Sequence, residues 1–237
     1  MSVEVLKSQA ENIVSRAEMH RRGIDCTGSL FLRFTRKMGM VRGINVGEYC
    51  KSWDVLKTVR FIEDNLPLDA PILDIGAYAS EVLCALHRLG YNSLSGVDLN
   101  QRLRQMPYAD KISYVVSDFL RMAFKNASFS AVTAISVIEH GFQSKELLTE
   151  LSRIIKQGGF FIASVDYWPD KIDTSGIKSF GMDWIIFSKD ALYSFLIEAE
   201  KFNFQPCGEL NFDALDRVVK WNGKQYTFAW LAMQKQP

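Results

Sequence analysis

Between Pro71 and Tyr167, short apolar runs alternate with segments of helical periodicity, and this alternation constrains the fold more than any other feature of the chain. The apolar runs predict strands at residues 71–76, 93–100, 112–119, 129–140 and 160–168. Helices are predicted at 80–90 and 144–159, each with glycine at its end. Strands that alternate with helices form βαβ units, so we expect a doubly wound, mostly parallel α/β sheet covered on both faces.

The two ends of the chain extend this pattern. After a predicted helix at 187–204, Asn222-Gly223 lies between strand-like runs and predicts a hairpin, so the seven-stranded sheet should end in antiparallel strands. Apolar residues at helical spacing predict an N-terminal helical cap over residues 1–45 and a further helix at 47–66. We therefore expect a cap at 1–45 and a main domain at 46–237.

The composition is that of an ordinary globular chain: 237 residues, 48% hydrophobic and 23% charged. No apolar run approaches the roughly 20 residues that span a bilayer, and the charged N-terminus argues against an export sequence. The four cysteines are scattered without a CxxC pair, which argues against a metal site and fits a cytoplasmic protein. The net charge of +1 argues against a general nucleic-acid partner.

Charge is nevertheless unevenly distributed, because residues 1–60 contain eleven Lys or Arg and six Asp or Glu. Within residues 30–43, cations interleave with apolar side chains: Arg33, Arg36, Lys37 and Arg42 with Phe31, Leu32 and Phe34. Such a segment can be a membrane-surface or RNA-contacting helix. We favour the simpler interpretation, a solvated face of a helix that caps the main domain.

The loop "DIGAYAS" after the first strand lies where doubly wound sheets bind ligands, at the carboxyl ends of the strands. A dinucleotide fingerprint would need glycine at 76, 78 and 81, but the chain has Gly76, Tyr78 and Glu81. A P-loop is excluded too, because no GK[ST] follows. The loop therefore does not predict a pyrophosphate ligand.

Asp74 indicates a different ligand, because a carboxylate would repel a pyrophosphate and suits a cation. S-adenosylmethionine carries an ammonium and a sulfonium and no phosphate, so its binding tolerates a side chain at Tyr78. Gly76 would still supply the tight turn, and Ser80 is small enough for a helix to pack closely on the strand.

Two further acidic residues follow the next two strands. Asp98 comes about twenty residues after Gly76, the spacing at which a carboxylate accepts hydrogen bonds from ribose hydroxyls. Asp118 can accept from an adenine amino group, while Phe119 offers an apolar contact. Three acids at successive strand ends predict a nucleoside cofactor of this kind.

On these stretches the chain resembles the class I S-adenosylmethionine-dependent methyltransferases, over about residues 53–165. The segments that carry the resemblance are "ILDIGAYAS", "SGVDLN", "VVSDF", "FSAVTAISVIEH" and "LLTELSRIIKQGGFFIAS". The family usually has glycine at the positions of Tyr78 and Ser80. The resemblance implies a Rossmann-like fold, with S-adenosylmethionine as cofactor and S-adenosylhomocysteine as product. It implies cofactor contacts from Asp74, Gly76, Ala77, Tyr78, Asp98, Leu99, Asp118, Phe119, Ser136 and Glu139.

Candidate catalytic residues lie at the ends of the fourth and fifth strands. His140 could act as a general base, because an imidazole titrates near neutrality. In the family, however, the Glu139–His140 pair often holds the loop beside the cofactor. Asp166 and Tyr167 are comparable candidates for catalysis, and either could instead cap a turn before Pro169.

Aromatic residues are candidates for acceptor contacts. The long segment after the fifth strand contains Trp168, Phe180 and Trp184, which could form a stacking wall or pack as core. Tyr49 and Trp53 could close over the cofactor, although their spacing also suits packing on one helix face.

The favoured hypothesis is methyl transfer from S-adenosylmethionine to a small-molecule acceptor, such as a sugar, a glycan precursor or a secondary metabolite, by in-line displacement. One alternative is a non-catalytic binding or partner module of the same fold. A second is an RNA methyltransferase that uses the basic N-terminal segment. A homodimer is left open.

Overall fold

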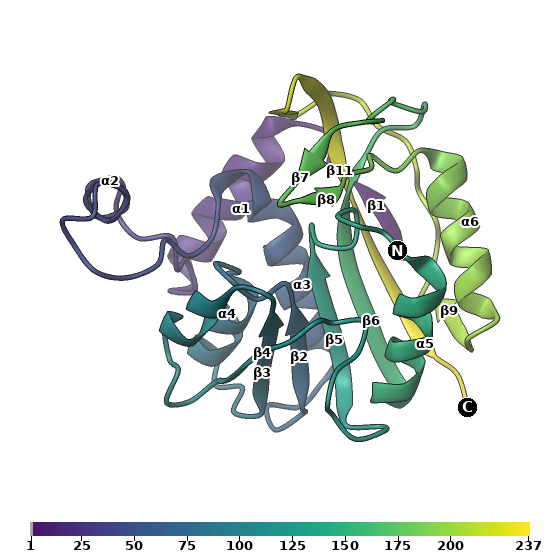
Figure 1. Cartoon of the computed structure of the whole chain (residues 1–237), viewed down its shortest axis with the longest axis horizontal. Helices are drawn as coiled ribbons and strands as arrows, with labels where there is room; N and C mark the ends of the chain where they lie inside the picture. Colours follow the sequence, from purple (N-terminus) through teal and green to yellow (C-terminus); the bar gives the residue numbers. More distant parts are fainter. Residues whose placement is uncertain (1) are drawn as a thin grey trace.

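The computed structural model describes residues 2–237 and contains a nine-stranded sheet (Figure 1). Seven strands form its main path in the order β1-β11-β6-β5-β2-β3-β4. Their bounds are β1 Val3–Val5, β2 Ile72–Ile75, β3 Leu94–Asp98, β4 Ser113–Val116, β5 Phe129–Ile135, β6 Ile155–Tyr167 and β11 Lys224–Lys235. Two short strands, β9 (Phe204–Pro206) and β10 (Val219–Trp221), also pair with β11. A separate hairpin consists of β7 (Lys178–Ser179) and β8 (Met182–Asp183).

The central strands are parallel, as the alternating pattern predicted. β4, β3, β2, β5 and β6 pair in parallel in that order, whereas β11 is antiparallel to β6. The predicted doubly wound, mostly parallel sheet is therefore confirmed. The chain reverses its direction of travel across the sheet between β2 and β5, so the loops after these two strands flank the crevice where such folds bind ligands.

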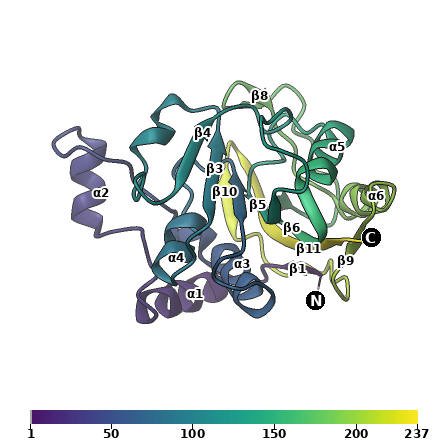
Figure 2. The ribbon, with the colours of Figure 1, turned by 90° about the horizontal axis from the view of Figure 1, so that it is seen from below.

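Helices cover both faces of the sheet, and each face has its own apolar core (Figure 2). On one face lie α1 (Gln9–Arg21), α3 (Ser52–Asn65) and α4 (Val82–Arg88); on the other lie α5 (Ser144–Ile154) and α6 (Lys189–Glu200). The short helices η1 (Tyr49–Lys51) and η2 (Gln101–Gln105) precede α3 and follow β3. The last helix, α2 (Leu30–Lys37), projects away from the sheet (Figure 1).

The C-terminal hairpin is confirmed. Asn222 and Gly223 have φ of 43° and 73°, the left-handed pair that a two-residue hairpin turn requires. Val219 pairs with Tyr226 across the turn.

The N-terminal segment differs from the purely helical cap that we expected. Residues 3–5 form β1, which pairs antiparallel with β11 at the register Val3–Leu231. Three residues are too few to show an alternating pattern, so the strand could not be identified without its partner. In addition, α2 leaves the body of the molecule and does not lie over the main domain (Figures 1 and 2).

Within residues 2–237, no helix combines the length and the apolar character that crossing a membrane requires.

Candidate functional site

The loop after β2 makes the tight turn that its sequence predicted. Gly76 has a φ of 72°, and a Cβ added there would lie 2.2 Å from Val137 Cγ2, so only glycine fits. Tyr78 is not left-handed, and its backbone N–H donates to Asp98 Oδ2 at 3.0 Å. The left-handed residue is Ala79, with a φ of 62°. Position 78 therefore has no backbone need for glycine, and the loop is held to β3 through Asp98.

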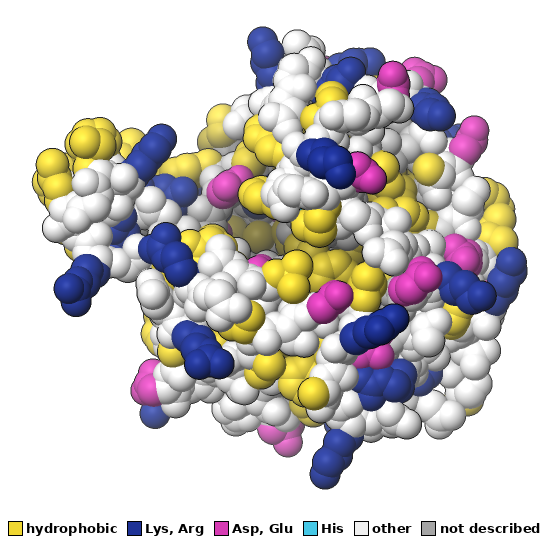
Figure 3. Space-filling view, in the orientation of Figure 1, with side chains coloured by type: hydrophobic (Ala, Val, Ile, Leu, Met, Phe, Trp, Pro, Cys, Tyr) yellow, Lys and Arg dark blue, Asp and Glu magenta, His cyan; other side chains and the backbone are white. Residues whose placement is uncertain are grey.

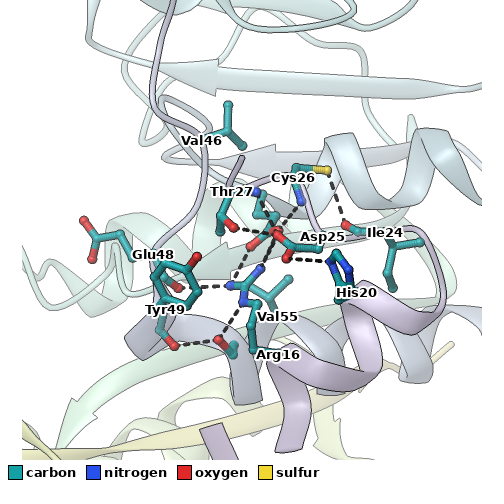
Figure 4. A network of polar contacts seen from close by, with 12 residues as sticks. Arg16, His20, Ile24, Asp25, Cys26, Thr27, Val46, Glu48, Tyr49 and Val55 are labelled. Atoms are coloured by element: carbon teal, nitrogen blue, oxygen red, sulfur yellow. Dashed lines mark hydrogen bonds and ion pairs between the residues drawn. The ribbon is translucent and has the colours of Figure 1, made fainter. Parts of the chain in front are cut away.

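Glu81, at the third glycine position of the fingerprint, has a structural role in the N-terminal segment. Its carboxylate is buried and accepts from Arg16 Nη1 and Nη2 at 2.8 and 2.9 Å, and from the Cys26 N–H at 2.6 Å. Arg16 also donates to Asp25 Oδ1 at 3.0 Å. Figure 4 shows Arg16 at the centre of this network, which joins α1 to the chain that enters the α2 segment. A buried, bidentate ion pair thus holds the loop after β2 against the N-terminal helices.

Asp74 lies at the end of β2 with one satisfied and one unsatisfied oxygen. Thr133 Oγ1 donates to Oδ1 at 2.6 Å, and the buried Oδ2 has no hydrogen-bond partner among the described residues. Burial raises the pKa of Asp74 to about 6, although the nearby Ser80 and Thr133 hydroxyls oppose the shift. An unpartnered carboxylate oxygen at this position fits an ammonium donor.

Asp98 lies half-buried at the end of β3. Its Oδ2 accepts from Tyr78 N and its Oδ1 accepts from Asn100 N at 2.8 Å. Each carboxylate oxygen can accept a second hydrogen bond, so both remain able to bind ribose hydroxyls. Leu99 is largely exposed beside it and provides an apolar surface.

Asp118 follows β4 and is exposed at the rim. Its Oδ1 accepts from the Leu120 N–H at 2.9 Å, which fixes the carboxylate while leaving Oδ2 free of any partner among the described residues. Phe119 is half-buried and packs against the core. Asp74, Asp98 and Asp118 therefore lie at the carboxyl ends of three adjacent parallel strands, as predicted.

A cluster of buried charged groups lies at the ends of β5 and β6. Lys51, on η1, hydrogen-bonds Ser136 Oγ, and its Nζ lies 3.5 Å from the centroid of the Phe228 ring. Ser136 itself is left-handed, with a φ of 51°. The side chains of Glu139 and Asp166 face this lysine and are almost fully buried.

The acids of this cluster titrate abnormally. Burial, and then the Asp166 carboxylate, raise the pKa of Glu139 well above its ordinary value, and both Glu139 oxygens have no hydrogen-bond partner among the described residues. Burial also raises the pKa of Asp166, although Lys51 and the indole N–H of Trp184 oppose the shift; that N–H donates to Oδ2 at 2.8 Å. On α3, burial raises the pKa of Asp54 to about 6. Two adjacent buried carboxyls can share a proton, as an acid–base pair requires.

His140 lies beside this cluster. Burial, and then the charge of Lys51, lower its pKa to about 4, so the imidazole is neutral at pH 7. The ring makes an edge contact with Phe180 at 5.2 Å and with Trp221 at 6.5 Å between centroids. Its Nδ1 is buried without a partner among the described residues. A neutral imidazole with so low a pKa is a weak proton acceptor.

The remaining aromatic candidates are divided between site and core. Tyr167 points to the face of β6 opposite Asp166, where its hydroxyl donates to the Phe212 carbonyl at 2.8 Å, away from the cluster. Trp184 is buried beneath the cluster, whereas Phe180 is exposed above His140. Trp168 is partly buried and packs against the same apolar cluster as Trp184. Of the three residues of the predicted wall, Trp168 and Trp184 therefore pack in or on the core, and Phe180 is exposed.

Sequence reasoning identified the strand-end acids but missed the groups from the N-terminal third of the chain. Arg16 is on α1, Lys51 on η1 and Asp54 on α3, and packing of these helices on the sheet brings the three side chains to the site. The residues Tyr49 and Trp53, flagged on the same segment as Lys51, were the nearest indication. Among residues 2–237, no group of three His, Cys, Asp or Glu side chains is arranged to hold a metal ion.

Residues 73–163 match the protein family described as a methyltransferase domain. A sterol 24-C-methyltransferase of Debaryomyces hansenii is 30% identical over 103 residues, which cover 42% of this chain and 27% of that protein. The chain therefore spans about a quarter of the length of this relative. An EEF1A lysine methyltransferase 2 of Mus musculus is 25% identical over 68% of this chain and 71% of its own length.

Solved structures show the same fold. The PH0226 protein of Pyrococcus horikoshii superposes with a TM-score of 0.58 and 17% identity, covering 86% of this chain and 99% of that one. The geranyl diphosphate C-methyltransferase of Streptomyces coelicolor, solved with S-adenosyl-L-homocysteine, gives a TM-score of 0.56 and 15% identity, covering 80% and 84%. The predicted Rossmann-like fold and the predicted resemblance are confirmed.

Proposed function

We propose that this chain, whose residues 73–163 form a domain of the S-adenosylmethionine-dependent methyltransferase family, transfers a methyl group to a small-molecule acceptor. The observation that carries the proposal is the placement of Asp74, Asp98 and Asp118 at the carboxyl ends of three adjacent parallel strands. They surround the tight turn at Gly76, a position that accommodates only glycine. S-adenosylmethionine is the cofactor of this family, and the charges around the loop suit it.

The geometry of the loop supports a specific set of cofactor contacts. We assign the free Oδ2 of Asp74 to the ammonium, the two oxygens of Asp98 to the ribose hydroxyls, and Asp118 with Phe119 to the adenine. The loop residues Ala77 and Tyr78, with Leu99 and Ser136, complete the proposed set. Glu139, which the resemblance placed beside the cofactor, is fully buried, and we assign it to the carboxyl pair with Asp166 instead. When bound, S-adenosylmethionine supplies an electrophilic methyl group on its sulfonium.

The groups at the ends of β5 and β6 would act on the acceptor. Asp166 and Glu139 form a buried carboxyl pair with raised pKa values, so one of them can hold a proton while the other accepts one. Lys51 balances their charge. His140, with its pKa of about 4, is better suited to hold an acceptor by hydrogen bonding than to take its proton. Phe180 and Trp221 provide an apolar wall beside it.

A small-molecule acceptor suits this arrangement, because the reactive carboxyls are recessed behind aromatic side chains. The names of the sterol and geranyl diphosphate methyltransferases among the similar proteins state small-molecule substrates. The acceptor of this chain is therefore expected to combine an apolar body with a group that loses a proton on methylation.

The test is calorimetric titration of the purified chain with S-adenosylmethionine and with S-adenosylhomocysteine. We expect both to bind in the micromolar range, and Asp98→Ala to weaken binding at least about tenfold, since hydrogen bonds to a charged group contribute about 1.5–3 kcal/mol. Asp110→Asn, an exposed acid at the opposite edge of the sheet, is the matched control. A folded chain that binds neither compound would instead support the non-catalytic module.

A further inference from the structure

The segment that projects from the body, residues 28–45, is defined here as the α2 lobe. It comprises α2 and the chain that returns to Val46, and both ribbon views show it beside the rest of the molecule with no element over its outer side (Figures 1 and 2). Its base is fixed, because Arg33 Nη1 donates to the carbonyls of Thr27 and Val46 at 3.1 and 3.0 Å. The lobe is therefore a built feature of the fold.

Apolar side chains cover the outer side of this lobe. Phe31 is 76% exposed, Leu30 is 73% exposed and Met40 is 69% exposed. Phe34, Met38 and Val41 are exposed as well. Leu30, Phe34 and Met38 follow one another at intervals of four positions, and Phe31 is next to Leu30. These four side chains therefore share one face of α2. Figure 3 shows these hydrophobic side chains gathered at the far end of the lobe.

The charge of the lobe has one sign. Residues 26–47 contain four cations, Arg33, Arg36, Lys37 and Arg42, and no Asp or Glu. Arg36 donates to the Ile44 carbonyl at 3.1 Å, so two of the four cations also hold the lobe together. On the helix, Lys37 lies directly beside the apolar face, Arg33 lies further round on the same side, and Arg36 lies opposite that face. The result is an exposed apolar face bordered by positive charge.

We propose that the α2 lobe docks on the surface of an anionic lipid bilayer. An amphipathic helix with a cationic border lies in the membrane interface with its apolar face among the acyl chains, and anionic headgroups complement the border. The aliphatic share of the face, from Leu30, Met38, Met40 and Val41, favours acyl chains over stacked RNA bases, which need aromatic or planar groups.

The position of the lobe links docking to the candidate site. Gly47, just beyond the lobe, donates its N–H to the Ala79 carbonyl at 2.8 Å, and Ala79 belongs to the cofactor loop. A bilayer under the lobe would therefore lie next to the mouth of the site. Docking itself does not depend on the proposed methyl transfer, so each can fail without the other.

The test is flotation of the full chain with vesicles of phosphatidylcholine and phosphatidylglycerol, without cofactor. We expect the wild-type chain to float with these vesicles, less with phosphatidylcholine alone, and less at high salt because the Debye length shortens. Phe31→Ser with Phe34→Ser should reduce partitioning about tenfold or more, and Lys37→Glu with Arg42→Glu should do the same on anionic vesicles. All four side chains are exposed, so these variants should fold.

Ile13→Ser with Val14→Ser is the matched control, because these α1 side chains are 63% and 66% exposed without a cationic border. This control should float like the wild-type chain. The proposal is overturned if the folded wild-type chain does not float, if neutral and anionic vesicles bind it equally, or if the lobe variants lose binding to single-stranded RNA and not to vesicles.

Discussion

The two terminal nitrogens of Arg16 lie 2.8 and 2.9 Å from the two carboxylate oxygens of Glu81, which occupies the third glycine position of a dinucleotide fingerprint. The departure from the glycine pattern is therefore compensated by a specific partner. The side chain at 81 joins the cofactor loop to α1, where a glycine would leave the buried arginine without its main acceptor.

Replacement of Glu81 should consequently be costly. Glu81→Gln leaves the buried Arg16 without a charge partner at this position, and we expect a loss of about 3 kcal/mol in the free energy of unfolding, measured by urea denaturation. Glu63→Gln, which breaks the Arg22–Glu63 pair on the surface, should cost under about 1 kcal/mol. Equal effects of the two variants would contradict the role of Glu81.

Alanine substitutions at Gly76 and Gly23 separate the cost of a left-handed backbone from the cost of a steric clash. Gly76→Ala combines a left-handed φ of 72° with a Cβ 2.2 Å from Val137, whereas Gly23→Ala has the same φ and nothing within 4 Å. We expect Gly23→Ala to destabilise by about 1 kcal/mol and Gly76→Ala by about 3 kcal/mol, with loss of cofactor binding only in the latter. Thermal unfolding measures the loss of stability and calorimetry measures cofactor binding. Similar losses of stability in the two variants would show that Val137 can move away from an added Cβ at position 76.

Asp54 should give the protein a distinctive pH dependence. Burial raises its pKa from 3.8 to about 6, so between those values the folded chain binds a proton that the unfolded chain lacks, and stability from this group rises as the pH falls. Asparagine does not titrate, so Asp54→Asn should be more stable than wild type at pH 7.5, by about 3 kcal/mol at most. The difference should shrink towards pH 4. Urea denaturation at both pH values is the measurement, and a difference independent of pH would contradict the shift.

Lys51 should control the titration of His140. Its charge is the second cause of the low imidazole pKa, after burial, so Lys51→Met should raise that pKa from about 4 part of the way towards 6.5. The C2–H resonance of His140, followed by NMR against pH, reports the change. Lys57→Met, which removes a lysine packed on the Trp230 ring, should leave the His140 titration unchanged. A wild-type pKa near 6.5 would contradict the burial of His140.

The parallel core and the strand-end acids could be predicted because each depends on local pattern. The apolar run of β2, the glycine after it and the acid after β3 lie within single elements, and the topology rule places their ends together. β1 could not be predicted, since Val3 and Val5 become a strand only through β11. Lys51 was missed for the same reason: it lies more than eighty residues before Glu139 and Asp166 in the chain, and no periodicity relates it to them. The projection of α2 also depends on tertiary structure, because its amphipathic pattern equally predicts a helix packed on the body.

The pairing of Val3 with Leu231 also determines when the sheet can close during synthesis. During synthesis β1 leaves the ribosome before β11, and the backbone groups of β1 find their partners only in residues 209–211 and in β11, more than two hundred residues later. Until then the growing chain carries an unpaired apolar strand next to the segment that later holds the cofactor loop. Folding of the parallel core can precede this step. Residues 229–231 are thus required to fix the position of residues 3–5.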